Sequence, residues 1–272
     1  MPTKEMQTNA QVTKTIEVHS ELVILKIAPD GWEFEEFSAG QFAVLGLPGK
    51  APRCKNSDPD VQPVDEDKLI RRAYSIGSAP SEKKELEFYI SLVASGGLSP
   101  RLLGLKEGDP IFLATKPKGT FTLDDVPEEQ NLVLMSTGTG ITPYLSMVRG
   151  SALDSGRKVA ILQGVRHSWD LGYNSELTAL QEQHSNLSYR AIVSRPQLEK
   201  TPWPGHTGHV QNLWASENPK EILGFEPNPE NTHIYLCGNP AMIKSAQEML
   251  EGQGYSLHSK SKPGNIHVEK YW

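Results

Sequence analysis

A glycine-rich turn is the first place in this sequence where residue types and spacing could do chemistry. Residues 136–143 read Ser-Thr-Gly-Thr-Gly-Ile-Thr-Pro and follow an apolar run. Glycines let backbone amides approach a phosphate, and the amino end of the helix that follows favours negative charge. The run is not a P-loop, because no Lys-Ser/Thr follows, and Pro143 replaces the last glycine of the dinucleotide fingerprint. It predicts a phosphate-binding turn, with a purely structural strand–helix turn as the alternative.

A second run, residues 71–75, reads Arg-Arg-Ala-Tyr-Ser and closes an expected strand. Arg72 could fork onto a pyrophosphate. Tyr74 projects to the same side of an extended chain and could lie flat on a ring system. Ser75 could donate to a ring nitrogen. The alternative is an ordinary strand surface, on which Arg and Tyr are common.

The third run, residues 96–102, reads Gly-Gly-Leu-Ser-Pro-Arg-Leu and joins a strand to a helix-like segment. We expect Ser99 as the N-cap and Pro100 as the first helical residue. Such an end could hold a second phosphate, and a capped helix without a ligand is the alternative.

Two further runs lie toward the end of the chain. Cys237-Gly-Asn-Pro240 ends an apolar strand and starts a helix, and ligands gather at the carboxyl ends of strands in open α/β sheets. The sequence ends in Tyr271-Trp272. These two aromatic residues could fill a gap in the core or cover a flat cofactor.

The elements that must position these runs differ between the two halves of the chain. Short apolar or alternating segments predict strands of a small antiparallel barrel or sandwich. They lie at residues 12–27 (two strands around a turn at His19-Ser20), 42–47, 86–93 and 111–114. Alternating strands and helices then predict a doubly wound parallel sheet, with strands at 132–135, 159–164, 188–193 and 233–237 and helices at 143–150, 175–184 and 240–253. The change of character places the domain boundary between residues 126 and 127. We interpret residues 48–69 as an extended hairpin loop or a tolerated surface insertion, to which the sequence assigns no role.

Charge and composition exclude several classes of protein. The 272 residues carry a formal net charge of −6, which disfavours a general nucleic-acid binder. The two cysteines, Cys54 and Cys237, lie far apart and outside any Cys/His cluster, so we expect neither a disulfide framework nor a metal site. The amino-terminal residues are polar and no stretch has the length of a membrane span, so we expect a cytoplasmic protein.

Taken in order, these motifs resemble the ferredoxin–NADP⁺ reductase family. The R-x-Y-S, G-x-L-S, G-T-G-I-x-P and C-G-N-P runs and the terminal V-E-x-Y-W recur there, and the resemblance extends from Ala39 to Trp272. The Y-W ending is similar to the bacterial branch. The resemblance implies an antiparallel β-barrel FAD-binding domain, residues 1–126, followed by an α/β doubly wound parallel-sheet NADP(H)-binding domain, residues 127–272.

The resemblance also implies roles for individual residues. The residues implied to bind FAD are Arg72, Ala73, Tyr74, Ser75, Tyr89, Gly97, Leu98, Ser99, Thr139, Tyr271 and Trp272. Those implied to bind NADP(H) are Gly138, Thr139, Gly140, Val165, Arg166, Ser194, Arg195, His209, Asn239 and Pro240. The residues implied to line the site of hydride transfer are Ser75, Cys237, Glu269 and Tyr271. Among the residues implied to bind NADP(H), Arg166 and Arg195 match the family's positions for binding the 2′-phosphate of NADP⁺, and bacterial relatives commonly carry arginine where this chain has His209.

The implied activity is electron transfer between NADPH and a one-electron carrier protein, a ferredoxin or flavodoxin, by hydride transfer to flavin N5. We expect the carrier to dock on a local basic patch formed by Arg71, Arg101, Lys116, Lys118, Lys262 and Lys270. Two alternatives stay open: an NADH-linked flavin reductase component of an oxygenase, and a non-catalytic nucleotide-binding sensor with the same fold.

Overall fold

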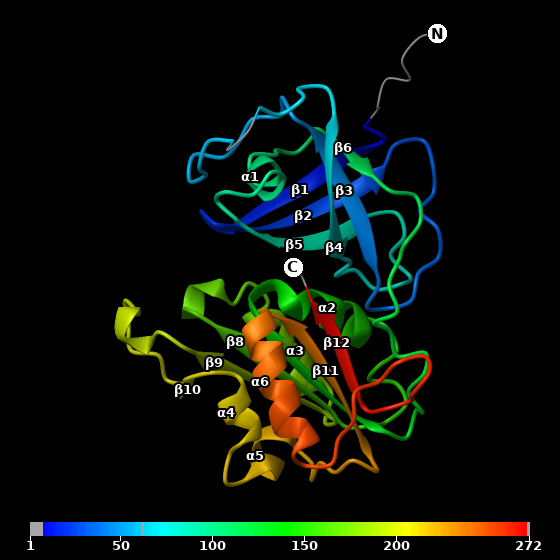
Figure 1. The fold of residues 1–272 in the computed structure, drawn as a ribbon, viewed down its shortest axis with the longest axis vertical. Coiled ribbons are helices and arrows are strands. Elements are labelled where there is room, and N and C mark those ends of the chain that lie inside the picture. Colours follow the sequence, from blue (N-terminus) through cyan, green and yellow to red (C-terminus); the bar gives the residue numbers. More distant parts are fainter. Residues whose placement is uncertain (1–7, 61–62, 271–272) are drawn as a thin grey trace. The chain divides into compact units, whose positions relative to one another are not determined.

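The computed structural model of the protein describes residues 8–60 and 63–270. The chain forms two compact units, which divide between Thr122 and Leu123 (Figure 1). Each unit has its own sheet. The domain boundary expected from the sequence, between residues 126 and 127, stays a prediction.

The first unit is an antiparallel sheet of six strands in the order β4-β3-β6-β1-β2-β5. Its strands pair antiparallel throughout, which confirms the predicted barrel-like β domain. The turn between the first two strands lies at Ser20-Glu21, one residue beyond the predicted His19-Ser20, because His19 still pairs with Leu22. The elements are β1 (Ala10–His19), β2 (Leu22–Pro29), β3 (Phe42–Pro48), β4 (Leu69–Ser75), β5 (Leu86–Ser91), α1 (Ser99–Leu102) and β6 (Pro110–Leu113).

Alternating apolar side chains of these strands fill the centre of the first unit. Leu25, Leu45 and Phe88 are completely buried there, and they come from three different strands. Burying aliphatic and aromatic side chains in this way contributes about 1.5–3 kcal/mol each. Burial of these side chains therefore stabilises the sheet.

One sequence-based expectation for this unit is wrong. Ser99 is the first residue of α1 and Leu98 occupies the N-cap position without a side-chain hydrogen bond. The Ser99 hydroxyl instead accepts a hydrogen bond from the Val93 amide at 3.0 Å. Because that bond ties the start of the helix to the end of the preceding strand, the hydroxyl is not available as a cap.

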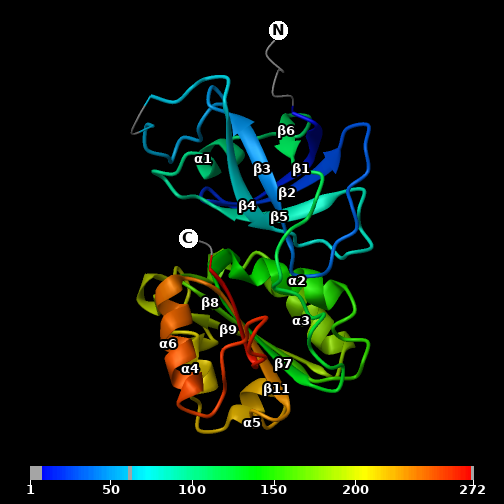
Figure 2. The ribbon, with the colours of Figure 1, turned by 45° about the vertical axis from the view of Figure 1, so that its right-hand side comes forward.

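The second unit is a parallel sheet in the order β10-β9-β8-β7-β11-β12, which confirms the predicted doubly wound fold. Figure 2 shows α6 and α4 on one side of this sheet and α3 on the other. The strands are β7 (Asn131–Thr137), β8 (Val159–Val165), β9 (Leu187–Val193), β10 (His206–Thr207), β11 (Thr232–Gly238) and β12 (Ile266–Lys270). The α-helices are α2 (Thr142–Arg149), α3 (Asn174–Gln183), α4 (Gln211–Trp214), α5 (Pro219–Leu223) and α6 (Pro240–Glu251). Short 3-10 turns are η1 (Gly138–Ile141), η2 (Ser168–Asp170) and η3 (Pro196–Leu198).

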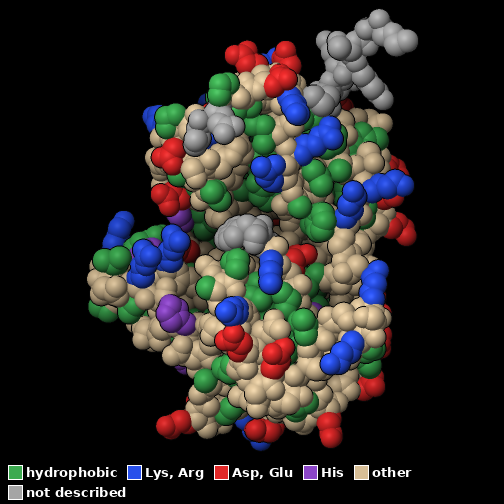
Figure 3. All heavy atoms as spheres, in the orientation of Figure 1, with side chains coloured by type: hydrophobic (Ala, Val, Ile, Leu, Met, Phe, Trp, Pro, Cys, Tyr) green, Lys and Arg blue, Asp and Glu red, His purple; other side chains and the backbone are tan. Residues whose placement is uncertain are grey.

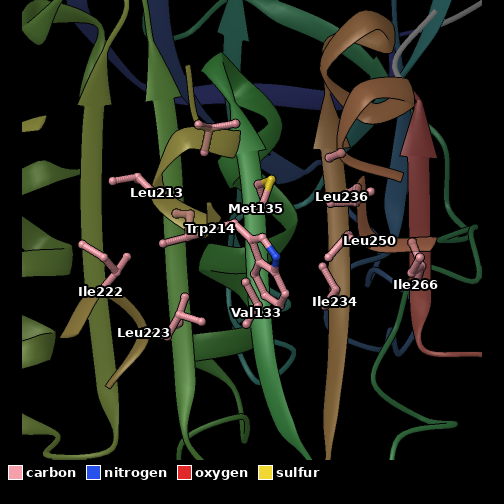
Figure 4. Packing of buried hydrophobic residues seen from close by; sticks show 14 of the residues in the cluster. Val133, Met135, Leu213, Trp214, Ile222, Leu223, Ile234, Leu236, Leu250 and Ile266 are labelled. Carbon is pink, nitrogen blue, oxygen red and sulfur yellow. The ribbon is translucent and has the colours of Figure 1, made fainter. Parts of the chain in front are cut away.

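The main core of the second unit lies between the sheet and helices α4 to α6. Val133 and Met135 of β7 and Ile234 and Leu236 of β11 lie in the same cluster of buried side chains as Trp214 (Figure 4). Four elements, β10, β12, α4 and α5, were not predicted from the sequence. Three of them span only two to five residues, too few for a hydrophobic period to stand out.

Within residues 8–60 and 63–270, the structure contains no helix with the length and apolar character needed to cross a membrane.

Candidate functional site

The order of strands in the second unit identifies one place at the sheet edge where a ligand could bind. From β7 the chain adds β8, β9 and β10 on one side, and then β11 and β12 on the other. The direction of winding thus reverses between β7 and β11. In open α/β sheets, ligands bind outside the carboxyl ends of the strands at such a switch point. The glycine-rich turn after β7 and the Cys-Gly-Asn-Pro run after β11 both lie there.

The two turns at the switch point are packed directly against each other. A Cβ atom on Gly140 would lie 2.5 Å from the Cys237 carbonyl oxygen. Gly238 has φ of +127°, and a Cβ atom there would lie 2.8 Å from the Thr137 carbonyl oxygen. The Asn239 amide donates to the Thr137 hydroxyl at 2.8 Å. Glycine is therefore required at both positions, because the backbones approach too closely for a side chain.

Helix α6 begins at the switch point with a defined cap. Its N-cap is Asn239, whose side-chain oxygen accepts a hydrogen bond from the Ala241 amide at 2.8 Å, and Pro240 opens the helix. On the β7 side, Gly138 has φ of +55° and starts η1 together with Thr139. All five residues predicted here for NADP(H), Gly138, Thr139, Gly140, Asn239 and Pro240, thus lie on two facing turns.

The residues predicted for the 2′-phosphate lie further along the same edge. Arg166 follows β8, Arg195 follows β9 and His209 follows β10, and these strands are neighbours in the sheet. The Arg195 amide donates to the Arg166 carbonyl at 3.0 Å, and all three side chains are exposed. Lys, Arg and His side chains gather where these loops protrude, at the left of Figure 3. The structure therefore brings together three positions that are separated in sequence.

The loop after β8 is shaped by contacts that the sequence analysis missed. Ser194 donates from its hydroxyl to the Val165 carbonyl at 3.1 Å, which joins the ends of β8 and β9. Glu199 accepts hydrogen bonds from the Ser168 amide and hydroxyl at 2.7 and 2.6 Å. His167 and Trp169 stack with ring centroids 4.4 Å apart. A tryptophan three residues after Arg166, in an otherwise polar segment, was the signal in the sequence that could have drawn attention to this loop.

Two residues predicted to line the reaction site are neighbours in the second sheet. Cys237 on β11 and Glu269 on β12 are register partners in a parallel pair. Cys237 is buried and Glu269 is half-buried. Tyr271 and Trp272 lie outside the described residues. Ser75, the remaining member of this group, belongs to the first unit.

In the first unit, β4 presents a face that joins two of the predicted motifs. Ile70, Arg72 and Tyr74 alternate along the strand and so share one side. A Cβ atom on Gly97 would lie 3.4 Å from Cγ2 of Ile70, in ordinary contact. The structure therefore places the Gly-Gly-Leu-Ser turn beside the Arg-x-Tyr-Ser strand.

The side chains along β4 differ in exposure. Arg72 is exposed, Tyr74 is half-buried and Ser75 is buried. Burial raises the pKa of the Tyr74 hydroxyl, and the charge of Arg72 lowers it to a smaller extent. Tyr74 is therefore a neutral phenol with an aromatic face. Ala73 points to the opposite side of the strand, and Tyr89 is buried on β5 opposite Ile24.

Two backbone amides of the Gly-Gly-Leu-Ser turn are available as hydrogen-bond donors to a ligand. Within residues 8–60 and 63–270, the amides of Gly97 and Leu98 donate no hydrogen bond to a protein acceptor. Leu98 and Ser99 are buried residues. Two adjacent backbone amides without acceptors are suited to an anion.

One expected member of the basic docking patch is not on the surface. The Arg101 side chain is only 2% exposed, because it bonds to the backbone of Gly49 and Gly97 and to Asp60. The prediction that Arg101 contributes to an exposed docking surface is therefore wrong. Arg71, Lys116, Lys118, Lys262 and Lys270 are exposed.

Comparison with known proteins agrees with this geometry. Residues 134–248 match the oxidoreductase NAD-binding domain family. The chain is 35% identical over 239 residues to a flavodoxin/ferredoxin–NADP reductase of Buchnera aphidicola, covering 87% of this chain and 88% of that protein. It is 34% identical to the Escherichia coli protein of the same name, with the same coverage.

A solved structure is similar over both units. The ferredoxin NADP⁺ reductase from Neisseria gonorrhoeae, with bound FAD and NADP, has a TM-score of 0.81 and 25% identity, and the match covers 97% of this chain and 98% of that one. Identity of 30% or more to several reductases over most of their length is decisive for family membership. This chain therefore belongs to the flavodoxin/ferredoxin–NADP reductase family.

Proposed function

We propose that this chain is an FAD-dependent oxidoreductase that moves electrons between NADPH and a one-electron carrier protein, a ferredoxin or a flavodoxin. The observation that carries the proposal is that each unit contains a backbone arrangement suited to binding an anion. One is the pair of amides without acceptors at Gly97 and Leu98. The other is the switch point between β7 and β11. The relatives of this chain carry the same activity in their names.

The residues of the first unit fit FAD. Arg72 would bind the pyrophosphate through its planar guanidinium, together with the amides of Gly97 and Leu98. Tyr74 lies on the same side of β4 and would orient the isoalloxazine ring by stacking. Ser75 would donate a hydrogen bond to the ring edge. Tyr89 and Ser99 would complete the wall of the site. Ala73, whose side chain points to the other side of β4, would contribute only its backbone. We assign Thr139, Tyr271 and Trp272 to FAD as well.

The residues of the second unit fit NADP(H). The turn at Gly138, Thr139 and Gly140 would receive the pyrophosphate, beside Asn239 and Pro240 at the start of α6. Arg166 and Arg195 would bind the 2′-phosphate with charge-assisted hydrogen bonds, with His209 next to them. Val165 and Ser194 would support the two arginines. The two arginines and His209 sit on adjacent loops, so their side chains could reach a single phosphate group.

Bound FAD would supply the ability to accept a hydride from a nicotinamide and to release electrons singly. The protein's own part is to bind, orient and shield. We assign Cys237 and Glu269, which are side by side in the sheet, to the lining of the nicotinamide site. Ser75 would hold a hydrogen bond at the flavin ring, and Tyr271 would cover its other face until the nicotinamide displaces it.

The carrier protein would dock on exposed lysine and arginine side chains. Arg71 lies over the Phe112 ring, with its guanidinium carbon 4.3 Å from the centroid, and Lys116 and Lys118 follow close by in sequence after β6. Figure 3 shows Lys and Arg side chains spread among apolar ones on the visible face of the first unit. Lys262 and Lys270 of the second unit are also exposed. Small electron carriers are usually acidic, so charge would steer the encounter.

The experiment that tests the proposal begins with the absorbance spectrum of the purified protein, where bound FAD gives bands in the visible. Arg72→Ala should then lose FAD on dialysis. The matched control is Arg71→Ala, because Arg71 is exposed on the same strand but on its opposite side. Full flavin occupancy in Arg72→Ala would refute the role of this arginine. A colourless wild-type protein that binds no added FAD would refute the proposed function.

A further inference from the structure

The loop between β3 and β4, to which the sequence assigned no role, is attached to the segment that contains the Gly-Gly-Leu-Ser turn. The Asp58 amide donates to the Ala94 carbonyl at 3.0 Å, and the Cys54 amide donates to the Pro100 carbonyl at 2.9 Å. These two bonds flank the turn. Residues 53–60 therefore lie along the backbone of residues 94–100.

Two arginines and one aspartate complete this attachment, and we call Arg53, Asp60 and Arg101 the loop triad. Asp60 accepts from Nη1 of Arg53 at 2.7 Å and from Nη2 of Arg101 at 2.7 Å. Arg53 also donates to the carbonyls of Gly96 and Ala94, at 3.0 and 2.8 Å. The triad thus joins the inserted loop to the turn through side chains as well as backbone.

Arg101 binds the next carbonyl of the turn. Its Nη1 donates to the Gly97 carbonyl at 2.7 Å, and its Nη2 donates to the Gly49 carbonyl at 2.6 Å. The carbonyls of Gly96 and Gly97 are therefore each held by a guanidinium group. Two consecutive peptide units receive a donor from the triad.

Holding these carbonyls also sets the direction of the amides. In a planar trans peptide unit, the C=O bond and the N–H bond point in opposite directions. When the Gly96 carbonyl faces Arg53, the Gly97 amide must face away from it. The same holds for the Gly97 carbonyl, Arg101 and the Leu98 amide. These are the two amides without protein acceptors in the described part of the chain.

We infer that Asp60 is a positioning residue for the phosphate-binding turn, acting through Arg53 and Arg101 to aim the amides of Gly97 and Leu98 at the FAD pyrophosphate. The inference rests on the proposed function, because it takes FAD as the ligand of this turn. It gives the inserted loop a role in cofactor binding. None of the triad side chains needs to touch the flavin.

The charges of the triad explain why Asp60 is essential to it. The Arg101 side chain is 2% exposed and the Arg53 side chain is 13% exposed, whereas Asp60 is 28% exposed. Two nearly buried guanidinium groups repel each other unless a carboxylate lies between them. The hydrogen bond from Arg101, together with the charges of both arginines, lowers the pKa of Asp60, so the carboxylate stays charged at neutral pH. Without it, Arg53 is free to turn toward water and release the Ala94 and Gly96 carbonyls.

The test compares Asp60→Asn with Asp67→Asn in the full-length chain. Asp67 is a matched control, because it lies in the same loop and pairs with Lys50 at 2.8 Å, but its side chain is 84% exposed. We expect Asp60→Asn to raise the Kd for FAD about tenfold, the usual cost of losing a charged partner. Asp67→Asn should stay within about twofold, as for an exposed ion pair.

The second measurement is the phosphorus-31 NMR spectrum of FAD at saturating concentration. A general loss of protein stability would not change the chemical shifts of the bound pyrophosphate. The pyrophosphate signals should shift in Asp60→Asn and stay in place in Asp67→Asn. Arg53→Lys is the second variant, should Asp60→Asn fail to fold. It keeps the charge at the rim but cannot serve two carbonyls and the carboxylate at once, so it should also raise the Kd.

The outcomes separate the inference from the proposed function. Wild-type protein that binds no FAD would overturn the proposed function and, with it, the inference. Wild-type protein that binds FAD, with Asp60→Asn equal to Asp67→Asn in Kd and in phosphorus spectrum, would overturn the inference alone. Tighter FAD binding by Asp60→Asn would also overturn it, because the positive charge of the arginines, rather than their orientation of the turn, would then govern affinity.

Discussion

His267 on β12 is placed so that acid should destabilise the second unit. Its ring stacks on Tyr235 with centroids 4.3 Å apart and on His258 with centroids 4.5 Å apart. Its Nε2 lies 2.9 Å from Nδ1 of His233. The residue is 6% exposed. A proton added to His267 would therefore place a charge in a buried stack that already holds two further imidazoles.

Burial, and to a smaller extent the neighbouring imidazoles of His233 and His258, lowers the pKa of His267 to about 3. The pKa of His233 is also lowered, by burial and then by His258 and Arg157. In the unfolded chain the ordinary value of 6.5 applies to His267. Between these two values the unfolded state binds more protons than the folded state. Stability is therefore fully present above pH 6.5 and is lost as the pH falls toward the folded pKa.

The size of the effect follows from the two pKa values. From pH 7.5 to pH 5.5 the unfolded imidazole takes up almost a full proton, while the folded one takes up almost none. The free energy of unfolding should fall by about 1.4 kcal/mol over this interval for His267 alone. His233 adds to the loss. The interval stays above the range in which ordinary carboxylates titrate.

The assay is urea denaturation of wild-type protein and His267→Gln at pH 7.5 and pH 5.5, followed by circular dichroism. His267→Gln should be less stable at pH 7.5, because the stack is lost, but its loss of stability between the two pH values should be smaller by about 1.4 kcal/mol. The control is His206→Gln, since His206 is exposed on β10. The same pH dependence in wild type and His267→Gln would refute the reasoning.

The nucleotide and carrier sites give three further predictions. Arg195→Ala should weaken NADPH binding about 10- to 100-fold, the cost of one charged hydrogen-bond partner, and leave NADH binding nearly unchanged. Equal losses in a titration of both nucleotides would count against a role at the 2′-phosphate. Carrier reduction should slow as salt is raised, because steering by exposed lysines is screened; stopped-flow rates that stay flat would argue against a basic docking surface. Deleting Tyr271 and Trp272 should tighten nicotinamide binding, produce a charge-transfer band and relax discrimination against NADH; unchanged affinity with no new band would mean that these residues do not gate the site.

The sequence by itself determined the elements that carry a strong local pattern. The alternation around His19-Ser20 predicted β1 and β2, and the apolar runs followed by helical patterns predicted β7, β8, β9 and β11 with α2, α3 and α6. These signals are local, because an element must bury one face and expose the other. The glycine requirement at the β7 turn was also visible in the sequence. Its cause, the close approach of Gly140 to the Cys237 carbonyl, was not.

Tertiary structure alone decided which distant residues meet. Asp60 and Arg101 are 41 positions apart in sequence, and nothing local marks them as partners. The same is true of β12, which becomes a strand by pairing with β11, so that Cys237 lies beside Glu269. Arg101 shows that residue type alone does not predict exposure. This arginine was expected on the surface, but it is buried and donates hydrogen bonds to a carboxylate and two backbone carbonyls. Charge compensation and backbone hydrogen bonding are properties of the folded chain, and no pattern along the sequence records which groups will provide them.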